Sequence, residues 1–153
     1  MDSDCGGAAA AYRARFGWPC TAAGYAVWML AGEVADAVDV PDFFGPGMVD
    51  ALRRADRPHV VIEVPGEQDS WRFLVRPGES RPHRLVRELA PHGAVLLSRA
   101  ALIELPPTRV RGGTLRWLHE PGGPVPALAH VAAALVTVVL AETRKSRTEH
   151  NSP

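Results

Sequence analysis

Alternating and continuous apolar runs predict short β-strands through the middle of the chain. Each run has four to seven residues, is rich in Val, Leu, Ile or aromatic side chains, and is bounded by Gly, Pro or charged residues. The predicted strands are Tyr25–Leu30, Val34–Val40, His59–Val64, Trp71–Val75, Ala94–Leu97, Leu102–Leu105 and Thr114–Leu118. Strands this short, interspersed with helical patterns, indicate an α+β fold.

Two of these runs support more detailed expectations. A turn at Gly32 and Glu33 separates the first two predicted strands, so we expect these strands to pair as a hairpin. In the third, Val60, Ile62 and Val64 share one face, which we expect in the core. His59 and Glu63 then share the face expected in solvent, too far apart to bond directly.

Helical spacing of apolar residues predicts three helices. Met48, Val49, Leu52 and Ala55 define a short helix ending in two arginines, where cations favour the helix dipole. A second short helix contains Leu85, Val86 and Leu89. The longest, Ala127–Arg144, is apolar nearly all round, which is typical of a helix that is buried or associates with a partner.

The long helix leaves three interpretations open. It packs against the sheet, or it forms a homodimer interface through Ala127–Arg144, or it enters a membrane. His130 and the many alanines make a membrane span a poor fit. We therefore expect packing against the sheet and no membrane contact, with a homodimer as the alternative.

The two ends differ in composition from the middle. Residues 1–11 are acidic and rich in Gly and Ala, so we expect a disordered head, and residues 146–153 are polar, so we expect a disordered tail. Between them, residues 12–145 form one predicted α+β domain. It contains a mixed or antiparallel sheet of short strands, two short helices and the long apolar helix. A total of 153 residues is ordinary for one domain.

Charge is balanced overall but uneven along the chain. Lys and Arg total 17, as do Asp and Glu, and only one of the cations is lysine. Residues 1–50 carry seven acids against two arginines, whereas residues 51–120 carry twelve arginines against eight acids. Zero net charge argues against a strongly basic nucleic-acid binder. If an anion or a nucleic acid binds, we expect the contacts at Arg72, Arg76, Arg109, Arg111 and Arg116.

Cysteine, histidine and glycine spacing predicts no standard catalytic or metal site. The two cysteines, Cys5 and Cys20, form no C-x-x-C pair, and the six histidines show no i, i+3 or i, i+4 spacing. No P-loop, dinucleotide-binding glycine motif or nucleophile elbow is present. We therefore predict no catalytic residue, metal or cofactor. Without a basic and apolar leader we also expect a cytoplasmic protein.

Three stretches resemble the N-terminal domain of bifunctional DNA primase/polymerases, the Prim-Pol domain, in its actinobacterial members. One is the Arg-Phe-Gly-Trp-Pro run that begins at Arg15. The next is His59–Val64 followed by Asp69–Val75, which is similar to the metal-site strand and the nucleotide-contacting strand. The last is Gly93–Pro107 continuing through Gly112 to Trp117, which is similar to the final strands. The resemblance implies the fold and a residual groove.

The departures from that family concern the residues that would catalyse its reaction. A metal site of this kind needs two carboxylates on one strand face, and the matching positions are Val61 and Glu63. The strand that should supply a histidine reads Trp71-Arg72-Phe73. The resemblance therefore implies a degenerate member, with Glu63 as a residual acidic position, and we expect no primase or polymerase activity.

These observations favour a non-catalytic, Prim-Pol-like regulatory module that binds a protein or a nucleic acid. The alternative is a small-molecule enzyme of tailoring or cyclase type, which works through a shape-defined apolar pocket. A third hypothesis is an adaptor, structural or toxin-associated, that dimerises through its last helix. A closed pocket with an inward acid or histidine would favour the enzyme. A flat sheet with the five arginines on one face would favour binding.

Overall fold

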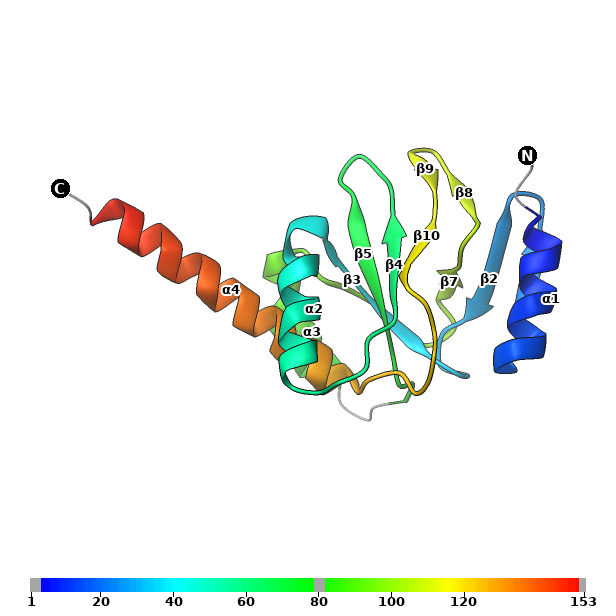
Figure 1. Ribbon diagram of the computed structural model, residues 1–153, viewed down its shortest axis with the longest axis horizontal. Coiled ribbons are helices and arrows are strands. Elements are labelled where there is room, and N and C mark those ends of the chain that lie inside the picture. The colour runs from blue at the N-terminus through cyan, green and yellow to red at the C-terminus, as the bar shows by residue number, and fades with distance from the viewer. Residues whose placement is uncertain (1–3, 79–81, 152–153) are drawn as a thin grey trace.

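The computed structural model describes residues 4–78 and 82–151, and it has an α+β architecture in which helices and antiparallel strands pack together (Figure 1). Its α-helices are α1 (Cys5–Phe16), α2 (Gly45–Arg54), α3 (Pro82–Leu89) and α4 (Leu128–His150). A short 3₁₀ helix, η1 (Asp42–Phe44), directly precedes α2, and another, η2 (Ala90–His92), directly follows α3. The predicted fold class is confirmed.

Within the described residues the strands form one large sheet and two small ones, all antiparallel. The five-stranded sheet has the order β10-β4-β5-β3-β6, and the three-stranded sheet has the order β1-β2-β7. Their strands are β1 (Thr21–Ala23), β2 (Ala26–Leu30), β3 (Asp36–Pro41), β4 (Val61–Val64), β5 (Ser70–Val75), β6 (Val95–Leu97), β7 (Leu102–Glu104) and β10 (Arg116–His119). A two-stranded ribbon joins β8 (Arg109–Val110) to β9 (Gly113–Thr114).

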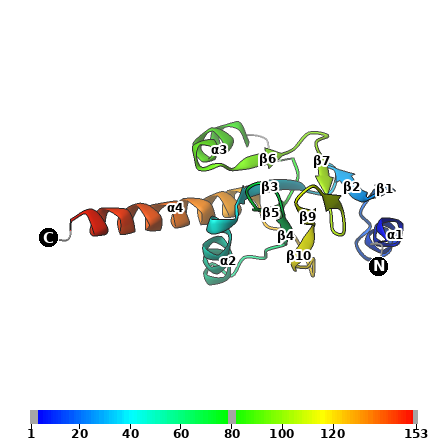
Figure 2. The ribbon, with the colours of Figure 1, turned by 90° about the horizontal axis from the view of Figure 1, so that it is seen from above.

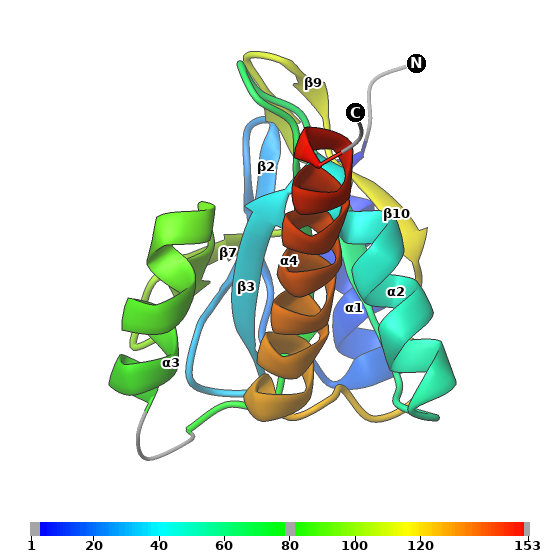
Figure 3. The ribbon, with the colours of Figure 1, turned by 90° about the vertical axis from the view of Figure 1, so that its left-hand side faces the viewer.

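Both faces of the five-stranded sheet are covered. Helices α2, α3 and α4 lie on one face (Figure 3), whereas α1 and the three-stranded sheet lie toward the other end of the molecule (Figure 2). Val61 and Phe73 belong to the core on the helix side, and Ile62 and Leu74 belong to the second core. The expectation of a solvent-facing side for β4 is therefore wrong at Val61, which is fully buried.

The predicted hairpin between the first two strands does not form. Strand β2 pairs with β1 and β7, and β3 pairs with β5 and β6, so the two neighbours in sequence belong to different sheets. Gly32, with φ +98°, allows the chain to change direction between them. An alternating pattern specifies which face of a strand is buried but not which strand is its partner.

The predicted disordered head contains most of a helix. Helix α1 begins at Cys5, and the side chain of Asp4 accepts a hydrogen bond from the amide of Gly7 at 2.9 Å, as an N-cap residue does. Cys5 and Ala9 are buried against the second core. Small residues conceal an amphipathic pattern, because Ala and Gly score as neither strongly apolar nor polar. Residues 1–3 of the predicted head lie outside the described residues.

Helix α4 is packed at its start and exposed at its end. Its inward residues between Leu128 and Leu135 are buried, which confirms packing against the sheet for this part. From Leu140 to Asn151 every residue is exposed, and the helix projects away from the domain (Figure 1). The predicted end near Arg144 and the disordered tail are wrong for residues 146–150, which are helical. No helix within residues 4–78 and 82–151 is long and apolar enough to span a membrane.

Candidate ligand-binding groove

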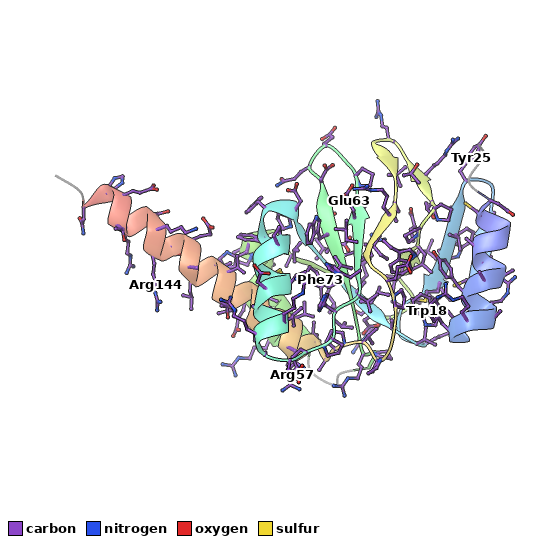
Figure 4. All side chains as sticks on the ribbon, viewed as in Figure 1. Trp18, Tyr25, Arg57, Glu63, Phe73 and Arg144 are labelled. Atoms are coloured by element: carbon purple, nitrogen blue, oxygen red, sulfur yellow. The ribbon has the colours of Figure 1, made fainter. Side chains whose placement is uncertain are left out.

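An open hollow of about 720 Å³ lies between the end of α1 and the segment that leads into α4. We call it the groove. Its lining residues are Arg15, Phe16, Trp18, Val34, Arg76 and the proline- and glycine-rich segment 121–125. In Figure 4, Trp18 and Arg57 lie in the lower half of the view, and Glu63 and Tyr25 lie in the upper half.

The aromatic wall of the groove is built by the end of α1. Gly17 has φ +68° and closes the helix in the left-handed conformation, which a residue with a Cβ seldom adopts. The chain then folds back, so that the rings of Trp18 and Phe16 lie 4.9 Å apart. The Arg15 guanidinium lies 5.0 Å from the centre of the Phe16 ring. This wall therefore combines flat apolar faces with a cation.

Hydrogen bonds hold this wall against the sheets. The Tyr12 hydroxyl donates to the carbonyl of Pro106, and the Trp117 indole donates to the Tyr12 oxygen at 3.0 Å. The Trp18 ring packs against both Tyr12 and Trp117. Burial raises the pKa of Tyr12, which keeps its phenol protonated. The wall is thus fixed before any ligand binds, which lowers the entropic cost of binding.

The opposite side of the groove carries Arg76, which directly follows β5. Its amide donates to the carbonyl of Pro126 at 2.9 Å, so the end of β5 is tied to the segment that precedes α4. The guanidinium is exposed and makes no ion pair with the described residues. Arg15 and Arg76 are the charged residues of the groove lining, which contains no carboxylate among the residues that the structure describes. The groove therefore has positive charge beside aromatic rings.

A second hollow of about 400 Å³ adjoins the groove. It is lined by Arg57, Pro58, His59, Val60 and Glu120, and it shares residues 122–124 with the groove. Sequence analysis assigned no role to Arg57 or to residues 122–124, and it interpreted His59 as a solvated residue. These residues lie near the ends of strands and helices that are distant in the sequence. Sequence patterns therefore do not group them.

The five arginines predicted to bind an anion do not form one face. Arg72 is 8% exposed, and it lies between the five-stranded and three-stranded sheets rather than on the surface. It donates two hydrogen bonds to the Asp39 carboxylate, at 2.8 and 2.9 Å, and one to the carbonyl of Glu104 at 2.8 Å. Arg72 therefore has a structural role, and a ligand on the surface has no access to its bonded guanidinium.

The remaining four are divided between the two ends of the sheet. Arg116 forms an ion pair with Glu63 at 2.8 Å, and Arg109 lies 5.6 Å from the centre of the Tyr25 ring. Figure 4 shows Glu63 and Tyr25 in the upper part of the view, above Trp18. Arg111 is exposed in the turn between β8 and β9. Of the predicted set, the groove includes Arg76 alone.

The two positions that match the family's metal site are engaged in packing or in an ion pair. Val61 is in the core and Glu63 is paired with Arg116. Within residues 4–78 and 82–151, no group of three or more His, Cys, Asp or Glu residues is arranged to hold a metal ion. Cys5 and Cys20 are buried free thiols, and burial raises the pKa of Cys20 to about 11. A thiol with such a pKa is a poor nucleophile at neutral pH.

No protein-family model, curated protein or solved structure matches the chain. The resemblance to the Prim-Pol domain therefore stays a prediction. Neither of the two discriminating arrangements is present at the groove, because it is open rather than closed, and the five arginines are dispersed. The groove itself is therefore the basis for assigning a function.

Proposed function

We propose that this protein is a non-catalytic binding module whose groove takes a flat ring that carries an anionic group, such as one nucleotide of a nucleic-acid strand. One observation carries the proposal: the exposed guanidinium groups of Arg15 and Arg76 lie beside the aromatic wall of Phe16 and Trp18 in one hollow. Because such a module binds its ligand without catalysing a reaction, we infer a regulatory role.

The residue types match this ligand class. A base or other flat ring stacks on an aromatic side chain with about 1–3 kcal/mol per ring, whatever its sequence. A guanidinium recognises phosphate or carboxylate oxygens through paired N–H groups. Trp18 and Phe16 supply the first contact, and Arg76 and Arg15 supply the second. Because net charge is zero, we expect modest affinity that weakens with added salt.

The state of the acidic positions supports a module that does not catalyse nucleotidyl transfer. Glu63 is neutralised by Arg116 on the neighbouring strand, and Val61 packs against the helices. A divalent ion bound to triphosphate needs several oxygen ligands. A single carboxylate that is already paired with an arginine is a poor metal site. The proposal therefore keeps the expected binding function of a degenerate Prim-Pol-like domain without its reaction.

The test measures binding of adenosine 5′-monophosphate by calorimetric titration at low salt. Adenosine, which lacks the phosphate, is the uncharged comparison. We expect the monophosphate to bind, adenosine to bind more weakly, and Arg76→Ala to lose about tenfold in affinity, the size of one charged hydrogen bond. Trp18→Ala should weaken both ligands.

Arg111→Ala is the matched control, because Arg111 is also an exposed arginine but lies outside the groove lining. Equal losses in Arg76→Ala and Arg111→Ala would mean diffuse charge attraction and would contradict the proposal. The proposal would also be rejected if neither ligand bound while the chain bound a protein partner, and if Trp18→Ala left binding of that partner intact.

A further inference from the structure

His59, which lines the second hollow, contacts a second histidine that is far from it in sequence. His59 precedes β4, and His119 ends β10, where the register against β4 shifts between Trp117 and His119. This irregularity places the two imidazole rings 4.6 Å apart at an interplanar angle of 80°. A bulge that redirects one side chain is a common device beside binding sites.

His59 has one buried nitrogen without a partner. Its Nδ1 is inaccessible and makes no hydrogen bond with the described residues. Because the side chain also lines the second hollow, Nε2 is the nitrogen that a ligand there can contact. A proton on Nε2 leaves Nδ1 as an unpaired acceptor, whereas a proton on Nδ1 would leave a buried N–H unpaired, which proteins rarely tolerate. His59 therefore presents a donor to the hollow.

Cations exceed anions around this pair. Arg57 lines the hollow, and Arg53 on α2 is close enough to act on His119. The pKa of His119 is lowered by burial first, and then by the charges of His59 and Arg53. Glu120 lines the same hollow and is its one carboxylate among the described residues. Burial and two neighbouring charges, those of His59 and Arg53, thus disfavour a positive charge on His119 unless an anion is added.

We propose that the second hollow binds a tetrahedral dianion, sulfate or phosphate, through Arg57 and His59 Nε2, and that binding is coupled to proton uptake by His119. The anion offsets the repulsion between His119 and Arg53, so it favours the protonated imidazole. Linkage then requires that the anion bind more tightly at lower pH.

This inference does not depend on the ligand of the groove. The second hollow shares residues 122–124 with the groove, so one ligand with two anionic groups can occupy both. A Cβ added at Gly122 or Gly123 would meet no atom within 4 Å, so the shared segment leaves open space. A free dianion and the second phosphate of such a ligand have the same recognition chemistry.

The test uses sulfate, whose charge is constant across the range in which histidine titrates. Sulfate affinity is measured by calorimetry at about pH 6 and about pH 8, where an imidazole changes charge. We expect binding to be about tenfold tighter at the lower pH, equivalent to one unit of pKa change in His119. His119→Gln should keep the affinity seen at the higher pH and lose the dependence on pH.

Arg57→Ala should abolish sulfate binding at both pH values, and Arg54→Ala is its control, since Arg54 is an exposed arginine of α2 outside the lining. Equal losses in the two variants, or sulfate affinity that does not vary with pH in the unmodified protein, would overturn the proposal. Neither result touches adenosine monophosphate binding in the groove, so the two proposals fail separately.

A competition experiment identifies the source of the dianion. If it is a group of the groove's own ligand, adenosine 3′,5′-bisphosphate displaces sulfate and the monophosphate does not. If it is free phosphate, inorganic phosphate displaces sulfate and both nucleotides leave it bound. If neither nucleotide nor inorganic phosphate displaced sulfate, the proposal of a site for tetrahedral dianions would be overturned.

Discussion

Arg72 and Asp39 face each other across β5 and β3 and form a two-pronged ion pair, with N···O distances of 2.8 and 2.9 Å. The third hydrogen bond of Arg72 goes to the carbonyl of Glu104 on β7, in the other sheet. One side chain therefore joins the five-stranded and three-stranded sheets. The arginine that sequence analysis assigned to ligand binding instead connects the two halves of the core.

Breaking this pair should cost substantial stability. Arg72→Met leaves the largely buried Asp39 carboxylate without its partner, and we expect the free energy of unfolding to fall by about 3 kcal/mol. Arg72→Met combined with Asp39→Leu should recover most of that loss, because no isolated charge remains. Urea denaturation of the three proteins measures both effects. A single variant as stable as the unmodified chain would show that the pair contributes little.

The N-terminal helix should contribute to folding through its cap. Asp4→Ala removes the acceptor for the Gly7 amide, so we expect a loss of about 1 kcal/mol in the free energy of unfolding. Asp4→Asn keeps an acceptor oxygen and should lose much less. Thermal denaturation compares them. If Asp4→Ala and Asp4→Asn had the same melting temperature as the unmodified protein, residues 4–16 would not be part of the cooperative fold.

Helix α4 should show opposite sensitivities along its length. Leu135 is fully buried, and Leu135→Asp should prevent stable folding, since an unpaired buried carboxylate costs several kcal/mol. Leu140 is 54% exposed, and Leu140→Asp should change stability by no more than about 0.5 kcal/mol. Light scattering of Leu140→Asp also tests the predicted homodimer through Ala127–Arg144. A dimer that this variant dissociates would show that the projecting part of the helix is an interface.

Acid should destabilise the protein through His119. Its folded pKa lies below the ordinary value of 6.5, mainly because of burial, so the unfolded chain binds the proton more readily. The contribution of this residue is complete above that ordinary value and is lost as the pH falls toward the folded pKa. Denaturation at a series of pH values without sulfate should show His119→Gln losing less stability over this interval. An identical pH dependence in both proteins would contradict the assignment.

Templated nucleotide incorporation should be absent with either Mg²⁺ or Mn²⁺. Val61 is buried where a second carboxylate would be needed, and Glu63 is bound to Arg116. A primer-extension assay with labelled nucleotide measures this directly. Incorporation that Glu63→Ala abolishes would show that the single carboxylate suffices and would reject the non-catalytic interpretation.

Local patterns predict the elements of this fold better than they predict the partners of each element. The run at residues 71–75 identifies β5, and the spacing of Met48, Val49 and Leu52 identifies α2, because each depends on neighbours in sequence. The sequence places Arg72 on the surface because its partner, Asp39, is 33 residues away along the chain. Pairing of this kind is decided by tertiary packing, and nothing in the spacing of charges reveals it.

The groove is unpredictable from the sequence for the same reason. Arg15 and Trp18 at one end of the chain meet Arg76 and residues 121–125 only after the sheets have formed. The available local signal is Gly17, whose left-handed conformation ends α1 and turns Trp18 back onto Phe16. The Gly-Trp step contributes to the family resemblance, but that resemblance gives the ring no role.

The most direct test of the groove is the response of the four tryptophan indole N–H signals to adenosine 5′-monophosphate in two-dimensional NMR. Trp18 lines the groove, whereas Trp28 lies on β2 and Trp71 on β5, outside its lining. We expect the Trp18 signal to shift in a saturable manner and the signals of Trp28 and Trp71 to stay in place. In Arg76→Ala the same shift should require about tenfold more ligand. A Trp18 signal that does not move at saturating ligand, or equal shifts at Trp28, would contradict the account.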